Sequence, residues 1–351
     1  YSTYKLKNAI DENSAPKDAQ FSAIPSTAAG TFSLFGTRFA YSFFSKYATR
    51  ARLSYRTDIL EDDIISELPG EENYIIDFAL NNVLNEQLIG LTWAHAFNEK
   101  FSLGISVFGS VYKQEGGTNL EYTLQAEDNR VAYYRNRPNF RQDSYGLVVK
   151  LGASYHFPKF DFGVNINVPY LEVYEKGRFN YQNVVAGIGT ENDQLYNYKL
   201  NDLKTRRKEP LGVSLGAGIP IKPHKLHVNL DYVSGLDSYS RLDIPPIDTG
   251  QEDLTTISFA EERRSIINFG IGGEFFINKY VNLYTGFSTD FNAIATDSDI
   301  LDVGDQPEVN SDLGSDFIHG SLGAQLKLKW GNLIIGATHT RSTTDFLSPS
   351  S

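Results

Sequence analysis

The segment DSYGLVVKLGASYHFPKFDFGVNINVPY (143–170) decides the fold. Within 144–155, apolar or aromatic residues at most second positions alternate with small or polar ones, and 160–168 repeats the pattern after the short turn at 157–159. A period of two places the apolar side chains on one face of a β-strand. The segment therefore predicts two antiparallel neighbouring strands, each with one apolar face.

The same period of two recurs along most of the chain. Most runs are about ten residues long, which matches the roughly 9–11 residues of a tilted membrane strand rather than the five or six typical of soluble strands. No stretch approaches 18 uncharged apolar residues, so a helical membrane protein is excluded. The further alternating runs are 50–56, 101–107, 211–221, 226–236, 267–275, 281–291, 318–330 and 333–337.

The connections between the runs alternate between short and long. Short turns fall at 45–48, 97–100, 157–159, 222–224, 277–280 and 330–332, and long polar stretches fall at 61–73, 113–143, 175–209, 237–263 and 292–315. This alternation is typical of an up-and-down barrel. We expect an all-β transmembrane antiparallel β-barrel of 12 or 14 strands, with short periplasmic turns and long acidic extracellular loops.

Composition narrows the possible functions. The net charge of -11 argues against nucleic-acid binding, which needs an excess of Lys and Arg. The chain has no cysteine, and its six histidines show no metal-ligand spacing. Residues 212–216 match the Gly-x-Ser-x-Gly nucleophile motif, but they lie inside an alternating run and not in a strand–turn–helix. We expect no enzyme activity, no catalytic residue, no cofactor and no metal site.

Residues 1–30 differ from the rest because they do not alternate. With Pro16, Pro25 and several small residues, this segment is either a plug inside the barrel or a disordered leader. A barrel of this size encloses more space than wall side chains fill easily, which favours the plug. We therefore divide the chain into a possible plug or hatch at 1–30 and a transmembrane barrel at 31–351.

Two features suggest a binding function. If the apolar faces meet lipid, a polar set points into the barrel: Arg50, Arg52, Arg56, Lys150, Asn229, Asp231 and Glu274. These residues either form a salt-bridged, water-filled interior, or their cations hold an anionic head group such as a carboxylate.

The second feature is Pro169, which removes a ladder donor where the alternation weakens. It marks either the end of the strand or a kink that opens a lateral gate in the wall.

Three segments resemble the outer-membrane transporter family for long-chain fatty acids and aromatic hydrocarbons (FadL/TodX type): 101–117, 160–179 and 318–340. The resemblance implies 14 strands, a bacterial outer-membrane location and passive uptake of hydrophobic molecules with lateral exit. It also implies an N-terminal hatch with an Asn-Pro-Ala turn, where this chain has AIPSTAAG (23–30).

Two other functions remain open. The chain is alternatively a non-catalytic barrel subunit of a larger outer-membrane secretion or assembly complex, or a general water-filled porin. The expected partners are membrane lipid, a hydrophobic small molecule and, for the subunit alternative, outer-membrane proteins.

Overall fold

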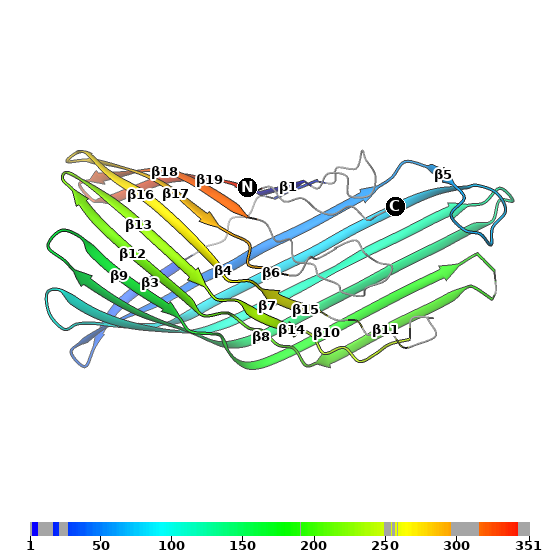
Figure 1. Cartoon of the computed structure of the whole chain (residues 1–351), viewed down its shortest axis with the longest axis horizontal. Helices are drawn as coiled ribbons and strands as arrows, with labels where there is room; N and C mark the ends of the chain where they lie inside the picture. The colour runs from blue at the N-terminus through cyan, green and yellow to red at the C-terminus, as the bar shows by residue number, and fades with distance from the viewer. Residues whose placement is uncertain are drawn as a thin grey trace.

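The computed structural model describes residues 2–5, 17–20, 27–189, 191–248, 254, 257, 259–295 and 316–342 (Figure 1). Within these residues all regular secondary structure is β-strand, and no helical segment has the length and apolarity of a membrane span. The main strands are β3 (Thr27–Leu34), β4 (Thr37–Arg56), β6 (Glu72–Ala96), β7 (Phe101–Gln125), β8 (Val131–His156), β9 (Asp161–Asn167), β10 (Leu171–Ala186), β11 (Gln194–Leu203), β12 (Gly212–Ile221), β13 (His224–Val233), β16 (Ile266–Asn278), β17 (Val281–Asp290), β18 (Phe317–Leu328) and β19 (Gly331–Ser342).

These strands form one antiparallel sheet whose order mostly follows the chain, as the alternating runs predicted. A path of 12 strands leads from β3 through β4, β6, β7, β8, β9, β12, β13, β16, β17 and β18 to β19. Off this path, β10 continues the pairing of β8 beyond β9, β11 pairs with β10, and the short β5 (Leu60–Asp62) pairs with β6. The prediction of an all-β, antiparallel fold is confirmed, and the curled sheet is consistent with a barrel (Figure 1).

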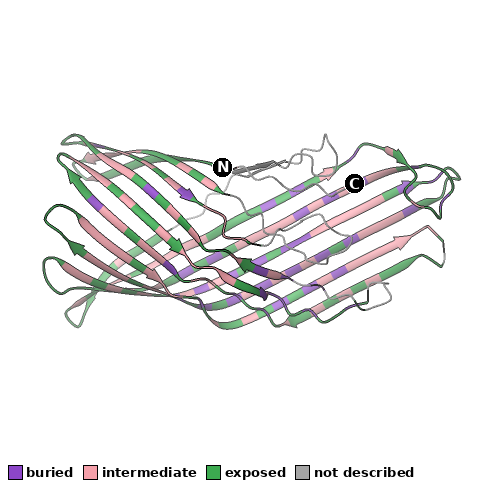
Figure 2. Ribbon diagram, viewed as in Figure 1, coloured by how far each residue is buried: buried purple, intermediate pink, exposed green. Residues whose placement is uncertain are grey.

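The sheet has two halves of different height (Figure 1). Strands β6, β7 and β8 have 25, 25 and 26 residues, whereas β12, β13 and β17 have 10 each. We call β4, β6, β7, β8, β10 and β11 the tall wall. Buried residues alternate with more exposed ones along these strands (Figure 2), so the buried side chains share one face. We call this the interior face and the opposite one the outward face.

Two of the long polar stretches are strands, which corrects their prediction as loops. Residues 113–143 continue β7 and β8 to a turn at 126–130, and residues 175–209 contain most of β10 and all of β11. The alternation there is hidden from a hydropathy reading because the outward face becomes charged while the interior face holds both polar and apolar side chains.

The described residues between 236 and 263 lie inside the tall wall. They include β14 (Leu236–Ser240) and β15 (Ala260–Arg263), which pair with each other. Between these two strands, apolar side chains of the inner segment pack against the wall: Leu242, Ile244, Ile247, Ile257 and Phe259. The wall contributes Phe140, Phe179 and Tyr181 to the same cluster. Gly177 permits the close approach, because a Cβ there would lie 2.4 Å from Leu242 and 2.5 Å from Thr205.

The predicted plug at 1–30 falls largely outside the described residues. Its described parts are β1 (Ser2–Lys5), β2 (Lys17–Gln20), which pair with each other, and the start of β3 at Thr27. The sheet therefore begins four residues before the boundary predicted at residue 31. Residues 6–16 and 21–26, and residues 296–315 of the last long stretch, lie outside the described residues.

Candidate functional site

The outward face of β8 changes from apolar to charged at one position. Tyr145, Leu147 and Leu151 are exposed outward, whereas Asp143 and Arg141 follow on the same face. On β7 the partner of Tyr145 is Val111, and the partner of Asp143 is Lys113, so the change falls at the same level on both strands. We call the apolar zone below this level the belt.

The belt has the dimensions and edges of a membrane zone. On β8 it covers residues 145–155, about the 9–11 residues of a tilted membrane strand. At its upper edge the rings of Tyr145 and Tyr174 lie 5.9 Å apart, and at its lower edge Phe157 lies 4.5 Å from both Tyr155 and Phe160. Aromatic rings at both edges of an apolar band are typical of membrane β-barrels.

The belt gives a first prediction. Leu147→Arg places a cation in the belt, and we expect it to destabilise the protein in lipid vesicles by about 2–4 kcal/mol. Asn139→Arg, on the same face of β8 above the belt, is the matched control and should change stability by less than about 0.5 kcal/mol. Urea titration in vesicles, followed by heat-modifiable gel mobility, measures both. Equal effects of the two variants would contradict the belt.

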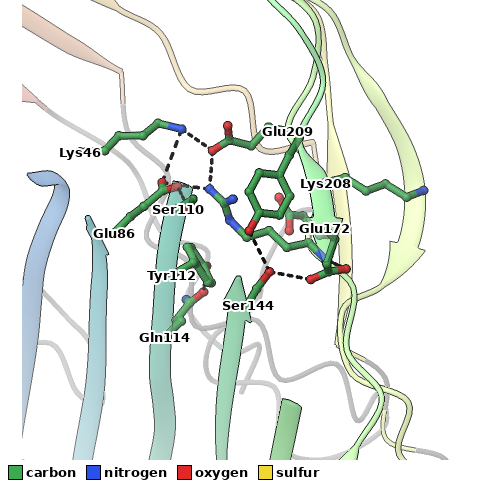
Figure 3. A network of polar contacts seen from close by, with 12 residues as sticks. Lys46, Glu86, Ser110, Tyr112, Gln114, Ser144, Glu172, Lys208 and Glu209 are labelled. Carbon is green, nitrogen blue, oxygen red and sulfur yellow. Dashed lines mark hydrogen bonds and ion pairs between the residues drawn. The ribbon is translucent and has the colours of Figure 1, made fainter. Parts of the chain in front are cut away.

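A buried charged network crosses the interior just above the belt (Figure 3). The guanidinium of Arg207 donates to Glu86 at 2.9 Å, and Lys46 lies 3.5 Å from the same carboxylate, which is fully buried. Glu209 contacts both Lys46 and Arg207. Arg207 and Glu209 belong to the inward segment 204–211 between β11 and β12, so the network holds this segment to β4 and β6.

Two tyrosine rings face the Arg207 guanidinium. Its central carbon lies 4.3 Å from the ring centroid of Tyr112 and 4.1 Å from that of Tyr170. Within the part of the chain that the structure describes, its buried Nη1 has no hydrogen-bond partner. Cation–π attraction to both rings explains how this nitrogen is accommodated without an oxygen.

Glu172 fixes the backbone of the same segment. It accepts from the Ser144 hydroxyl at 2.6 Å and from the Arg207 amide at 3.2 Å, and the hydroxyls of Ser144 and Tyr170 lie 3.1 Å apart. Ser110 donates to Glu86 at 2.6 Å. The inward segment is thus held by both a side chain and a backbone amide.

A second polar cluster lies on the interior face of the tall wall, farther above the belt than the first. Arg241 donates to Gln142 at 2.9 Å, contacts Gln114 and lies 3.4 Å from Glu261. Burial opposes ionisation of Glu261, yet the guanidiniums of Arg241 and Arg263 hold its pKa below the ordinary value. This cluster anchors residues 236–263 to β7 and β8.

The wall is interrupted at Pro169. β9 ends at Asn167, β10 begins at Leu171, and the register against β8 shifts by one residue between them. On the other side, β12 pairs with β9 only as far as Asn167, and β11 pairs with β10 only from Gly177. On the side away from β8, residues 168–176 therefore pair with no strand in the described part of the chain. We call this side of residues 168–176 the open edge.

The predicted inward orientation of Arg50, Arg52 and Arg56 is wrong. A register shift at Lys46 reverses the faces of β4, so Ala51 and Leu53 are the buried residues and the three arginines point outward. The same bulge turns Lys46 into the interior network. Because this part of β4 lies above the belt, its apolar face meets the interior and not lipid.

Lys150 does lie on the interior face, as predicted. It shares that face of β8 with the buried Ser144 and Val148, and it is close enough to Glu86 and Glu209 to interact with them electrostatically. Asn229, Asp231 and Glu274 are also on the interior side, opposite the exposed Leu230 and Phe275. The structure brings none of the three predicted arginines to Lys150.

The functional residues that sequence reasoning missed are Glu86, Glu172, Arg207 and Glu209. Glu86 carried one signal: it occupies the same parity as Leu84 and Leu88, which indicates a charge on an otherwise apolar face. Arg207 and Glu209 lie in a mixed run of charges with no periodicity, so nothing in the sequence distinguished them from a solvated loop. In the described residues no group of three or more His, Asp or Glu side chains is placed to hold a metal ion.

Comparisons with known proteins give matches among solved structures, all at low identity. No family model and no curated protein matches the chain. Among solved structures it is similar to the toluene transporter TbuX of Ralstonia pickettii, with 12% identity, a TM-score of 0.44 and coverage of 91% of this chain and 81% of that one. It is similar to the toluene transporter TodX of Pseudomonas putida (12% identity, TM-score 0.47, coverage 92% and 76%). The ferric yersiniabactin uptake receptor FyuA of Yersinia pestis gives 11% identity, a TM-score of 0.33 and coverage of 98% and 56%.

Proposed function

We propose that this chain spans a bacterial outer membrane at the belt and provides a passive path for hydrophobic small molecules, which leave through the wall at Pro169. The observation that carries the proposal is the open edge. A membrane wall normally pairs every strand, because unpaired backbone groups in lipid each cost several kcal/mol. Because an unpaired stretch at the upper part of the belt is costly, we infer that it serves a function.

The open edge has apolar side chains. Leu171 is 50% exposed and Val173 is 72% exposed, and Leu171 pairs with Leu147 of the belt. A molecule that reaches this edge from the interior meets apolar side chains at the level of the membrane. This arrangement favours lateral exit of an apolar ligand over passage of an ion or a sugar through a polar channel.

The inward segment 204–211 stands beside this exit. Arg207 and its network occupy the interior at the same level, so we propose that the segment acts as a movable stopper. For a ligand with a carboxylate, such as a long-chain fatty acid, Lys150 is the proposed anchor, because it lies on the interior face and no ion pair engages it within the described residues. A neutral hydrocarbon has no carboxylate to anchor, so its exit would require only the apolar side chains of the open edge.

A reversible lock tests the stopper. Thr205 and Leu242 form an antiparallel bridge, a spacing that suits a disulfide, and the chain has no other cysteine. We expect oxidised T205C/L242C to reduce uptake about tenfold, because segments 204–211 and 236–247 can no longer separate, and reduction to restore it. Uptake of radiolabelled toluene and of a radiolabelled long-chain fatty acid is measured in cells with and without the protein.

A second disulfide serves as the control. Ser102 and Ser154 pair across β7 and β8 with their hydroxyls 2.7 Å apart, so S102C/S154C cross-links the wall alone and should leave uptake unchanged. Equal uptake by cells with and without the protein would contradict the transport proposal. Uptake that persists in the locked variant would contradict the stopper.

A second candidate function is a subunit of a larger outer-membrane complex. The tall wall continues well beyond the belt, and in the described residues the outer edge of β11 has no strand partner. An unpaired strand edge is a template for pairing with another chain. Purification from native membranes tests this candidate, which predicts stoichiometric co-purifying proteins, lost when Asn197 on β11 is replaced by proline.

A further inference from the structure

The outward face of the tall wall above the belt carries an excess of cations. We call this surface the upper outward face. Each of its five carboxylates is in an ion pair with a cation of the same face: Asp77 with Arg56, Glu121 with Arg135, Glu115 and Asp143 with Arg141, and Asp202 with Lys176. Six further cations remain on the face: Arg50, Arg52, Lys113, Arg137, Arg178 and Lys199.

This excess is unusual for the chain as a whole, whose net charge is -11. It is also concentrated, because Arg178 stands directly opposite Arg141 in the register of β10 and β8. Glu115 and Asp143 offset the charge of Arg141, but the face still carries four paired and six further cations against five carboxylates. This excess points to an anionic partner outside the chain.

The level of three of these cations identifies the partner. Lys113 is the first outward residue of β7 beyond the belt edge at Val111, and Arg178 lies one row higher, in the same row as Arg50 across the sheet. At about 3.3 Å per residue and a strand tilt of about 45°, they lie roughly 5–9 Å above the belt edge. The head-group layer of a membrane is roughly 5–8 Å thick on each side, so these long cationic side chains reach it.

We propose that Arg50, Lys113 and Arg178 form a binding surface for the phosphate groups of membrane-lipid head groups in the leaflet beside the tall wall. The guanidinium fork matches a phosphate in a bidentate geometry, and the Lys113 ammonium adds a point charge. Tyr145 and Tyr174 at the belt edge contact the same lipids at the boundary of their acyl chains. The inference rests on the proposed membrane position but not on uptake.

Native mass spectrometry of the purified full chain in detergent micelles tests the surface. The probes are phosphatidic acid and phosphatidylcholine with identical acyl chains. We expect phosphatidic acid to be retained about tenfold more strongly, with the difference fading in high salt because exposed charges are screened. R50Q/K113Q/R178Q should reduce this retention about tenfold or more, since each cation near an anionic lipid surface adds to binding.

Two control variants separate position from charge. R50K/K113R/R178K preserves the charge and should keep retention, whereas R52Q/R137Q/K199Q removes the same charge from rows farther above the belt and should reduce retention less than about threefold. Heat-modifiable gel mobility verifies that each variant is folded. Equal retention of the two lipids, equal effects of the two glutamine variants, or an unchanged R50Q/K113Q/R178Q would overturn the inference. A surface that docks a protein instead would leave lipid retention unchanged in every variant.

Discussion

Replacing Arg207 with methionine is expected to destabilise the protein by about 3–5 kcal/mol, because it leaves buried carboxylates without their cation. Glu86 is fully buried, and Glu209 is mostly buried, so in the variant Lys46 is the one cation of the described residues left within ion-pair distance of both. The variant also loses the contacts of the guanidinium with the rings of Tyr112 and Tyr170. Denaturant unfolding in detergent micelles measures the change.

The matched control for this variant restores the charge balance. In R207M/E209Q, one carboxylate is removed with the guanidinium, and Lys46 remains for Glu86. We expect this double variant to recover at least about half of the lost stability, because an uncompensated buried charge costs more than a missing pair. If the single and double variants were equally unstable, the network would not be a charge-balanced anchor.

Replacing Phe179 with alanine is the second large effect that we expect, at about 3–5 kcal/mol. The ring is fully buried and contacts Phe259 edge-on at a centroid distance of 5.7 Å, in the cluster that holds residues 242–247, 257 and 259 to β10. The cavity left in the cluster should release this inner segment before the wall unfolds. Limited proteolysis in micelles should therefore cut the variant within 242–259 at a protease concentration that leaves the unmodified protein intact.

Arg178→Ala is the control for Phe179→Ala. Arg178 immediately precedes Phe179 on β10 and points outward, so the variant removes a long side chain without touching the cluster. Its stability in micelles should change by less than about 0.5 kcal/mol. Cleavage of both variants at the same rate would show that the inner segment is not held by this packing.

Much of the wall was predictable from alternation. The segment 143–170 becomes the end of β8, a short turn and β9, as its period of two indicates. The strand β6 was missed because polar and apolar side chains occur on both of its faces: Asn81 and Ile89 point outward, and Glu86 and Leu88 point inward. A hydropathy pattern identifies a strand only where one face is uniformly apolar.

The interior site was mostly not predictable, for two physical reasons. A one-residue bulge at Lys46 reverses the faces of β4, and no residue type in the run at 45–48 requires it. The segment 204–211 leaves the wall because its charged side chains find partners on β4 and β6, and its Arg207 amide finds one on β10, all distant in the sequence. The strand break near Pro169 and the inward position of Lys150 each depend on a single strand, whereas a lateral gate and ligand binding at these residues stay predictions.

Single-cysteine labelling in intact cells tests most directly whether the belt lies in the membrane. The chain has no cysteine of its own, so N139C and L147C each provide one thiol on the outward face of β8, above and within the belt. With a membrane-impermeant maleimide added outside the cells, the proposed orientation predicts rapid labelling of N139C and little labelling of L147C. Labelling of L147C at the same rate as N139C would show that the belt is in contact with water, and would contradict the membrane position on which the proposed function depends.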